Sequence, residues 1–104
     1  MDEQINLFDC LGYPSIEDLD EEKIAEIVGC ALNVKFRPAE RYGHIAEISK
    51  IKLTLRKCNE NRHGGTGPWL SCDWWNKTEG GGMGAESIKE AVDYYRYCLE
   101  RCKE

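Results

Sequence analysis

The sequence predicts an α+β domain in which a small antiparallel sheet has helices packed on one face. Three observations predict it: a capped apolar stripe near residue 20, strand-like alternation between residues 45 and 77, and a second capped stripe at the end of the chain. The expected order is helix, short strand, long strand, second strand and helix (α-β-β-β-α). A length of 104 residues suffices for a single domain. We place this domain at residues 15–104, after an N-terminal arm of residues 1–14.

The first helix is expected to begin after Asp20, because this residue type is favoured at N-caps. Ile24, Ile27, Val28 and Ala31 follow at helical spacing and form its apolar stripe. Pro38 and Gly43 interrupt any regular pattern after this helix. A short strand is therefore expected near residues 32–37.

Residues 45–57 are expected to form one long strand with one face buried. Ile51, Leu53 and Leu55 alternate there with polar residues. A loop of residues 59–68 leads to a second strand at residues 69–77, where the alternation returns. The glycines of residues 80–84 are expected to end that strand and to connect it flexibly to the last helix.

The last helix is predicted by a capping box of Ser87 and Glu90, followed by apolar residues at helical spacing. The order of elements resembles that of double-stranded-RNA-binding domains, a family with a lysine cluster at the start of this helix. Residues 86–90 are acidic on balance here. The resemblance therefore implies the topology and not the RNA site.

The composition indicates a soluble globular protein, with 41% hydrophobic and 32% charged residues. No run of 18 apolar residues is present, and the first residues lack the features of a secretory signal. We therefore expect a cytoplasmic protein, in a bacterial host, with its six cysteines as reduced thiols. The net charge of −5 is uneven: residues 1–30 hold nine acids and one base, whereas residues 31–63 hold eight bases and three acids.

No catalytic, cofactor or metal site is predicted. His44 and His63 fall in expected loops without a recognisable nucleophile. Zinc usually binds pairs of cysteines two to four residues apart, and only Cys98 and Cys102 come close to that spacing. Those two cysteines fall on the apolar stripe of the last helix, where small core residues are expected. The glycines of residues 80–84 precede a helix without the lysine of a phosphate-binding loop.

Two surfaces are predicted to bind a protein partner. Three tryptophans in so short a chain cannot all be buried, so Trp69 and Trp75 are expected at an interface. Acids on the exposed side of the first helix, Glu21, Glu22 and Glu26, are expected to dock on a basic channel.

The N-terminal arm carries a third candidate. Gln4, Leu7 and Phe8 resemble the peptide by which bacterial proteins bind the DNA sliding clamp, where the Leu and Phe fill an apolar pocket. The alternative is that Leu7 and Phe8 pack on the domain's own core.

These features favour a non-enzymatic interaction protein that inhibits or redirects a nucleic-acid-processing protein. In being short, acidic and α+β, the chain is similar in general type to phage or mobile-element anti-defence proteins, which include anti-CRISPR inhibitors of nucleases. The alternative is a nucleic-acid-binding module. Lys50, Lys52 and Arg56 would contact phosphates, while Trp69 and Trp75 on the neighbouring strand would stack on bases.

Overall fold

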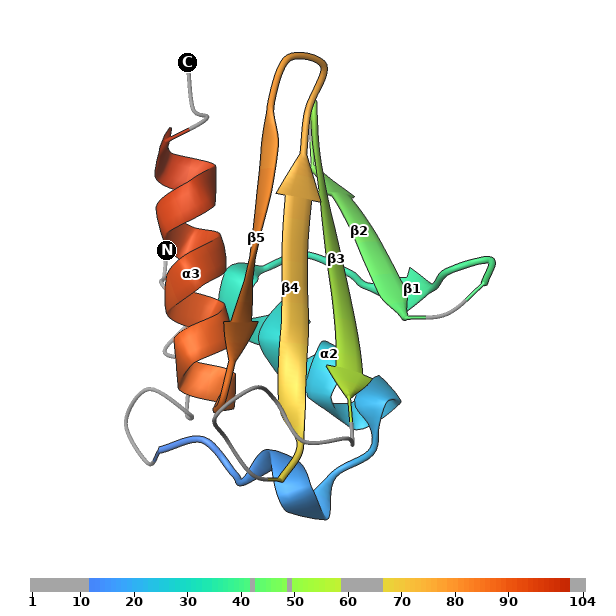
Figure 1. Cartoon of the computed structure of the whole chain (residues 1–104), viewed down its shortest axis with the longest axis vertical. Helices are drawn as coiled ribbons and strands as arrows, with labels where there is room; N and C mark the ends of the chain where they lie inside the picture. The colour runs from blue at the N-terminus through green and yellow to red at the C-terminus, as the bar shows by residue number, and fades with distance from the viewer. Residues whose placement is uncertain (1–11, 42, 49, 59–66, 102–104) are drawn as a thin grey trace.

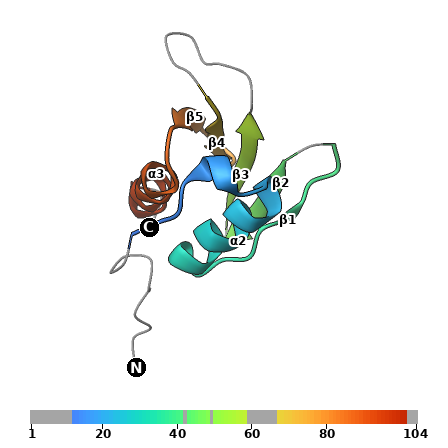
Figure 2. The same cartoon turned by 90° about the horizontal axis from the view of Figure 1, so that it is seen from below.

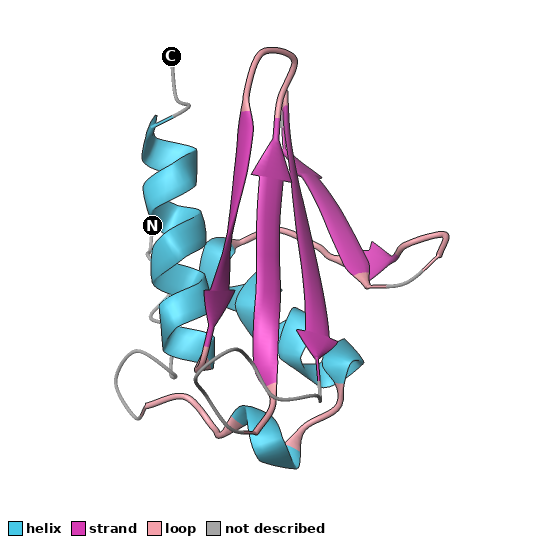
Figure 3. Ribbon diagram, in the orientation of Figure 1, coloured by secondary structure: helices cyan, strands magenta, loops and turns pink. Residues whose placement is uncertain are grey.

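A five-stranded antiparallel sheet with two α-helices on one of its faces makes up the fold (Figure 1). The computed structural model describes residues 12–41, 43–48, 50–58 and 67–101. The elements are η1 (Ile16–Asp18), α2 (Glu21–Leu32), β1 (Arg37–Pro38), β2 (His44–Ile48), β3 (Ile51–Cys58), β4 (Trp69–Trp75), β5 (Gly80–Ala85) and α3 (Ile88–Arg101). The strands follow one another across the sheet in chain order (Figure 3). The predicted α+β class is confirmed.

Both helices begin at the predicted caps. The Lys23 N–H donates to Asp20 Oδ1 over 2.9 Å at the start of α2. The Glu90 N–H donates to Ser87 Oγ over 3.1 Å at the start of α3. These side chains satisfy backbone donors that the first turn of a helix leaves unpaired.

The core lies between the sheet and the two helices, which occupy the same side of it (Figure 2). α2 contributes Ile24 and Val28, and α3 contributes Tyr95, all fully buried. The sheet contributes alternate residues of its central strands: Ile51, Leu53, Leu55, Leu70, Cys72 and Trp74. The other residues of β3 and β4 therefore point away from the helices.

The expected long strand of residues 45–57 is wrong: two strands, β2 and β3, occupy this region. They pair in antiparallel fashion, with Ile48 opposite Ile51 beside the turn and His44 opposite Leu55 at the far end. The core-facing residues are even-numbered in β2 and odd-numbered in β3, and the prediction of one strand missed this change of phase between Ile48 and Ile51. The short strand expected near residues 32–37 lies later and is shorter: α2 extends to Leu32, and β1 comprises Arg37 and Pro38, with Pro38 on the edge of the sheet, where a missing N–H is tolerated.

The glycines of residues 80–84 form most of strand β5, contrary to the predicted connection. Glycine is disfavoured in strands, but these glycines make room for large neighbours on β4. A Cβ on Gly81 would lie 3.1 Å from Trp74 Nε1, and a Cβ on Gly82 would lie 2.0 Å from Asp73 Oδ1. The described residues therefore form five strands where the sequence predicted three.

Candidate partner-binding surface

One face of the sheet turns away from α2 and α3, and no helix in the described part of the chain covers it (Figure 2). This open face carries Lys52, Thr54 and Arg56 of β3 and Ser71, Asp73 and Trp75 of β4. β3 and β4 pair so that Lys52 lies opposite Trp75, Thr54 opposite Asp73 and Arg56 opposite Ser71. The predicted juxtaposition of a cation and a tryptophan on adjacent strands is therefore present at Lys52 and Trp75.

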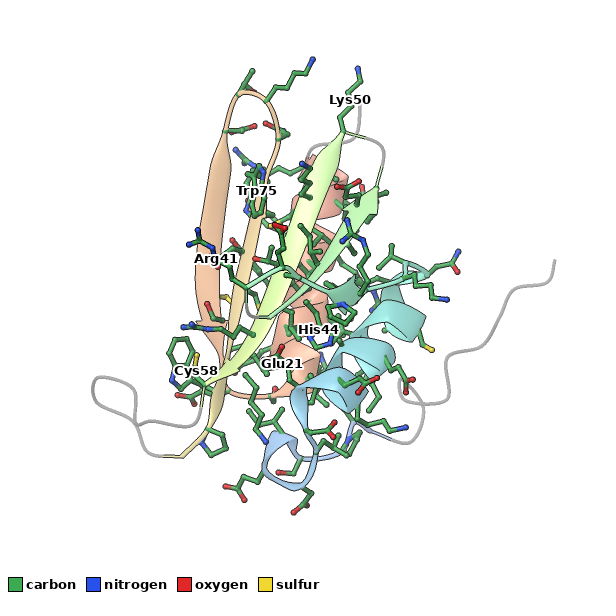
Figure 4. All side chains as sticks on the ribbon, turned by 90° about the vertical axis from the view of Figure 1, so that its right-hand side faces the viewer. Glu21, Arg41, His44, Lys50, Cys58 and Trp75 are labelled. Atoms are coloured by element: carbon green, nitrogen blue, oxygen red, sulfur yellow. The ribbon has the colours of Figure 1, made fainter. Side chains whose placement is uncertain are left out.

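Trp75 lies at one end of the open face and borders a groove of about 400 Å³. Its side chain is 40% exposed, an unusual exposure for an indole ring. The groove is lined by Glu47, Lys50, Ile51, Lys52, Trp75, Asn76 and Lys77, and we call it the Trp75 groove. Figure 4 shows Trp75 and Lys50 at the same end of the molecule, near the turns that follow β2 and β4.

The charges around the Trp75 groove are mixed. Lys50, Lys52 and Lys77 supply three positive charges, and Glu47 supplies one negative charge. The Glu47 carboxylate lies 3.8 Å from Lys52 Nζ and 3.7 Å from Arg37 Nη2. These three side chains are about half exposed, so each ion pair contributes at most about 1 kcal/mol to stability. The pairs nevertheless reduce the positive charge that a ligand would meet.

Trp69 does not join Trp75 in one site. It lies opposite Cys58 at the other end of β4 and is half-buried. The two tryptophans are six positions apart in β4, a distance of about 20 Å. Trp74, between them, belongs to the core with 7% exposure. Trp75 is thus the exposed tryptophan of the described residues.

The acidic residues of α2 lie on the opposite side of the sheet from Trp75. Glu21 is held within the molecule: its Oε1 accepts from the Lys57 N–H over 2.8 Å, and its Oε2 lies 2.7 Å from His44 Nδ1. Glu22 and Glu26 are exposed and border a second groove of about 640 Å³ between α2 and the segment that follows it. The structure therefore separates the predicted acidic and aromatic binding residues into two surfaces.

His44 lies in strand β2, so its expected placement in a loop is wrong. Its bond to Glu21 joins β2 to the start of α2 and was not predicted, because the two residues are 23 positions apart in the sequence. Glu47, Asn76 and Lys77 of the Trp75 groove were also missed. Glu47 could not be placed there without recognising β2 as a strand of its own.

Other sequence candidates are placed as follows. Cys58, Cys72 and Cys98 are buried, and Cys30 is exposed. Within the described ranges, no three His, Cys, Asp or Glu side chains gather as a metal ion would require. Gln4, Leu7, Phe8, Cys10, His63 and Cys102 lie outside the described residues.

The buried thiol of Cys72 gives the fold a testable dependence on pH. Burial raises the pKa of Cys72 from 9.0 to about 12, and burial also raises the pKa of Tyr95. Above pH 9 the native state keeps a thiol proton that the unfolded chain releases. Raising the pH from about 9 toward 12 is therefore expected to lower the free energy of unfolding. Urea unfolding monitored by circular dichroism at several alkaline pH values measures this free energy. If it fell with pH as steeply in Cys72→Ala as in the wild type, the dependence would not come from the Cys72 thiol.

Comparisons with protein-family models, with curated proteins and with solved structures find no match to this chain. Among the described residues, no helix is long and apolar enough to cross a membrane.

Proposed function

We propose that this protein is a non-enzymatic interaction protein that binds a protein partner through the Trp75 groove. The observation that carries the proposal is the 40% exposed Trp75 beside a groove of about 400 Å³. Protein interfaces often depend on one large aromatic side chain that becomes desolvated within a polar rim. Lys50, Lys52 and Lys77 provide such a rim. The fitting partner surface presents carboxylates beside an apolar side chain.

The charge pattern favours a protein over a nucleic acid. Glu47 faces Lys52, and Asp73 occupies the middle of the open face, where each would repel a phosphate backbone. A surface for single-stranded nucleic acid usually stacks successive bases on several aromatic rings. Here Trp69 is half-buried and lies about 20 Å from Trp75 along the strand.

The proposed partner is a nucleic-acid-processing protein, such as a nuclease or a replication component, which this protein inhibits or redirects. The small size, the net charge of −5 and the α+β fold support this class, because they match the general type of phage anti-defence proteins. The likeness is one of type and includes no shared motif.

A nucleic-acid-binding module is the second candidate function. It is favoured by the direct opposition of Lys52 and Trp75 and by the two further lysines of the groove. In this case Lys52 would contact a phosphate while the Trp75 ring stacks on a base.

The two candidates differ in their response to oligonucleotides and salt. The purified protein is expected not to bind fluorescent single-stranded or double-stranded oligonucleotides at physiological salt, in fluorescence anisotropy titrations. It is expected to capture a protein from a nuclease-treated bacterial lysate. Tight oligonucleotide binding that weakens steeply with salt would replace the first proposal with the second.

Variants of the acidic residues of α2 test whether the partner binds the Trp75 groove or the α2 side of the protein. Glu22→Gln together with Glu26→Gln removes two exposed charges on the far side of the sheet from Trp75. Capture by this double variant is expected to equal that of the wild type. Loss of capture here, with normal capture by a Trp75 variant, would assign binding to α2 instead.

A further inference from the structure

Strand β5 forms an open edge of the sheet. The register of β4 and β5 continues into a turn in which the Asn76 N–H donates to the Glu79 carbonyl over 2.9 Å. Backbone groups alternate in direction along an antiparallel strand. Glu79 points its carbonyl toward β4 in this turn, so the next residue, Gly80, points its backbone N–H and C=O away from β4. The same holds for every second residue after it, Gly82 and Gly84. No hydrogen bond within the described part of the chain uses these groups.

This edge lacks the features that usually prevent strands from pairing with other chains. Such features include charged side chains, prolines and very short edge strands. At the opposite edge, β1 has two residues, one of them Pro38. β5 has six residues, all of them glycine, methionine or alanine. Among the described residues, Met83 is the largest side chain that β5 itself carries, and β5 carries no charged side chain that a second strand would meet.

Helix α3 runs beside β5 (Figure 1). Glu90, Tyr94, Tyr97 and Arg101 are spaced by four, three and four residues, so they form one row along the helix. The Tyr94 hydroxyl would lie 3.6 Å from a Cβ on Gly81 and accepts from Trp74 Nε1 over 3.1 Å, so Tyr94 of this row lies over β4 and β5. Arg96, around the helix from this row, binds the Ala31 carbonyl of α2. Tyr97 is 59% exposed.

We propose that β5 and α3 form a symmetric interface with a second copy of this chain. Antiparallel pairing of two β5 strands about Gly82 places Gly80 opposite Gly84 of the other copy, and the outward backbone groups then bond to one another. The two sheets become one continuous sheet. A two-fold interface of this kind uses the same surface on both copies.

The row on α3 is complementary to itself in the same arrangement. When two such rows run antiparallel, Tyr94 faces Tyr97 of the other copy, and Glu90, whose Oε1 accepts from the Glu86 N–H over 2.8 Å, turns its second carboxylate oxygen toward Arg101 of that copy. α3 packs against both β4 and β5, so its axis lies about midway between two strands that are about 4.8 Å apart. Extending the sheet by pairing β5 strands then places the two α3 axes about 10 Å apart, a normal distance for packed helices. The strand pairing and the helix pairing are therefore compatible.

The mass of the full-length protein in solution tests this proposal. Sedimentation equilibrium from low to high micromolar concentration is expected to show a reversible dimer of 11.9 kDa chains. Tyr97→Ala is expected to weaken dimerisation about tenfold or more, because an exposed aromatic becomes buried at the interface. Lys89→Ala, also exposed on α3 but not three or four residues from any member of the row, is the control and should dimerise as the wild type does.

A matched pair at Gly82 tests the backbone pairing. Gly82→Ala and Gly82→Pro both place a Cβ against the Asp73 carboxylate, which is the movable end of a side chain. Only proline also removes the outward N–H, so Gly82→Pro should be monomeric and Gly82→Ala should dimerise.

If Gly82→Pro does not fold, amide hydrogen exchange of the wild-type protein tests the β5 pairing instead. The amides of Gly80, Gly82 and Gly84 should become protected as the protein concentration rises. The proposal is overturned by a monomer at all concentrations, or by a dimer that neither Tyr97→Ala nor Gly82→Pro weakens. A monomer whose β5 amides are protected only when a partner protein is added would also overturn it, in favour of strand addition by that partner.

Discussion

Trp74→Ala is expected to lower the free energy of unfolding by about 3–5 kcal/mol. Trp74 is 7% exposed and packs within the core beneath Gly81. Its indole Nε1–H donates to the Tyr94 hydroxyl over 3.1 Å, so the substitution removes a hydrogen bond as well as apolar contacts. A domain of this size is stable by about 5–15 kcal/mol, so the loss should be visible as a much lower urea midpoint by circular dichroism.

The neighbouring residue provides the control for this measurement. Trp75→Ala removes the same side chain from the next position of β4, but on the open face of the sheet. Its stability should fall by less than about 1 kcal/mol, since surface changes away from special features have small effects. Equal losses in the two variants would contradict the assignment of opposite faces.

Trp75→Ala is expected to weaken binding of the captured protein partner by about 30-fold or more, which corresponds to about 2 kcal/mol. An aromatic side chain in a desolvated groove typically carries this much of the binding energy. Surface plasmon resonance with the purified partner measures the dissociation constant. The weaker binding should come mainly from a faster dissociation rate.

Lys52 allows the contribution of charge to be separated from that of the aromatic ring. Lys52→Glu reverses the charge directly opposite Trp75 and is expected mainly to slow association, with a dependence on salt. Lys89→Ala, exposed on α3, should leave both rates unchanged. If Trp75→Ala binds as the wild type does while remaining folded, the Trp75 groove is not the binding surface.

The helices were the most predictable part of the fold. Asp20 and Ser87 act as caps through contacts with residues three positions away, and apolar residues recur at helical spacing after each of them. Such contacts lie within one turn of the chain, so the sequence alone contains their physical cause. The strand conformation of β3 and β4 was predictable because apolar and polar residues alternate within each of these segments.

Strand β5 was not predictable from local preference, and the break between β2 and β3 was missed. Gly80–Ala85 has the composition of a loop, and its strand conformation depends on pairing with β4. Trp74 and Asp73 fill the space that the missing side chains of Gly81 and Gly82 leave. The core-facing residues are even-numbered in β2 and odd-numbered in β3, so the phase of the alternation changes between Ile48 and Ile51, a local sign that the prediction of one strand missed.

The sequence by itself determined the α+β class, the capped helices and the presence of tryptophans on both faces of one strand. These properties follow from periodicity and from contacts close in sequence. Only the tertiary structure decided which residues share a surface: it brought Lys52, Lys77 and Glu47 to Trp75, directed Glu21 to His44, and placed Glu22 and Glu26 on the other side of the sheet. These groupings depend on strand register and helix packing between distant segments, which no local pattern records.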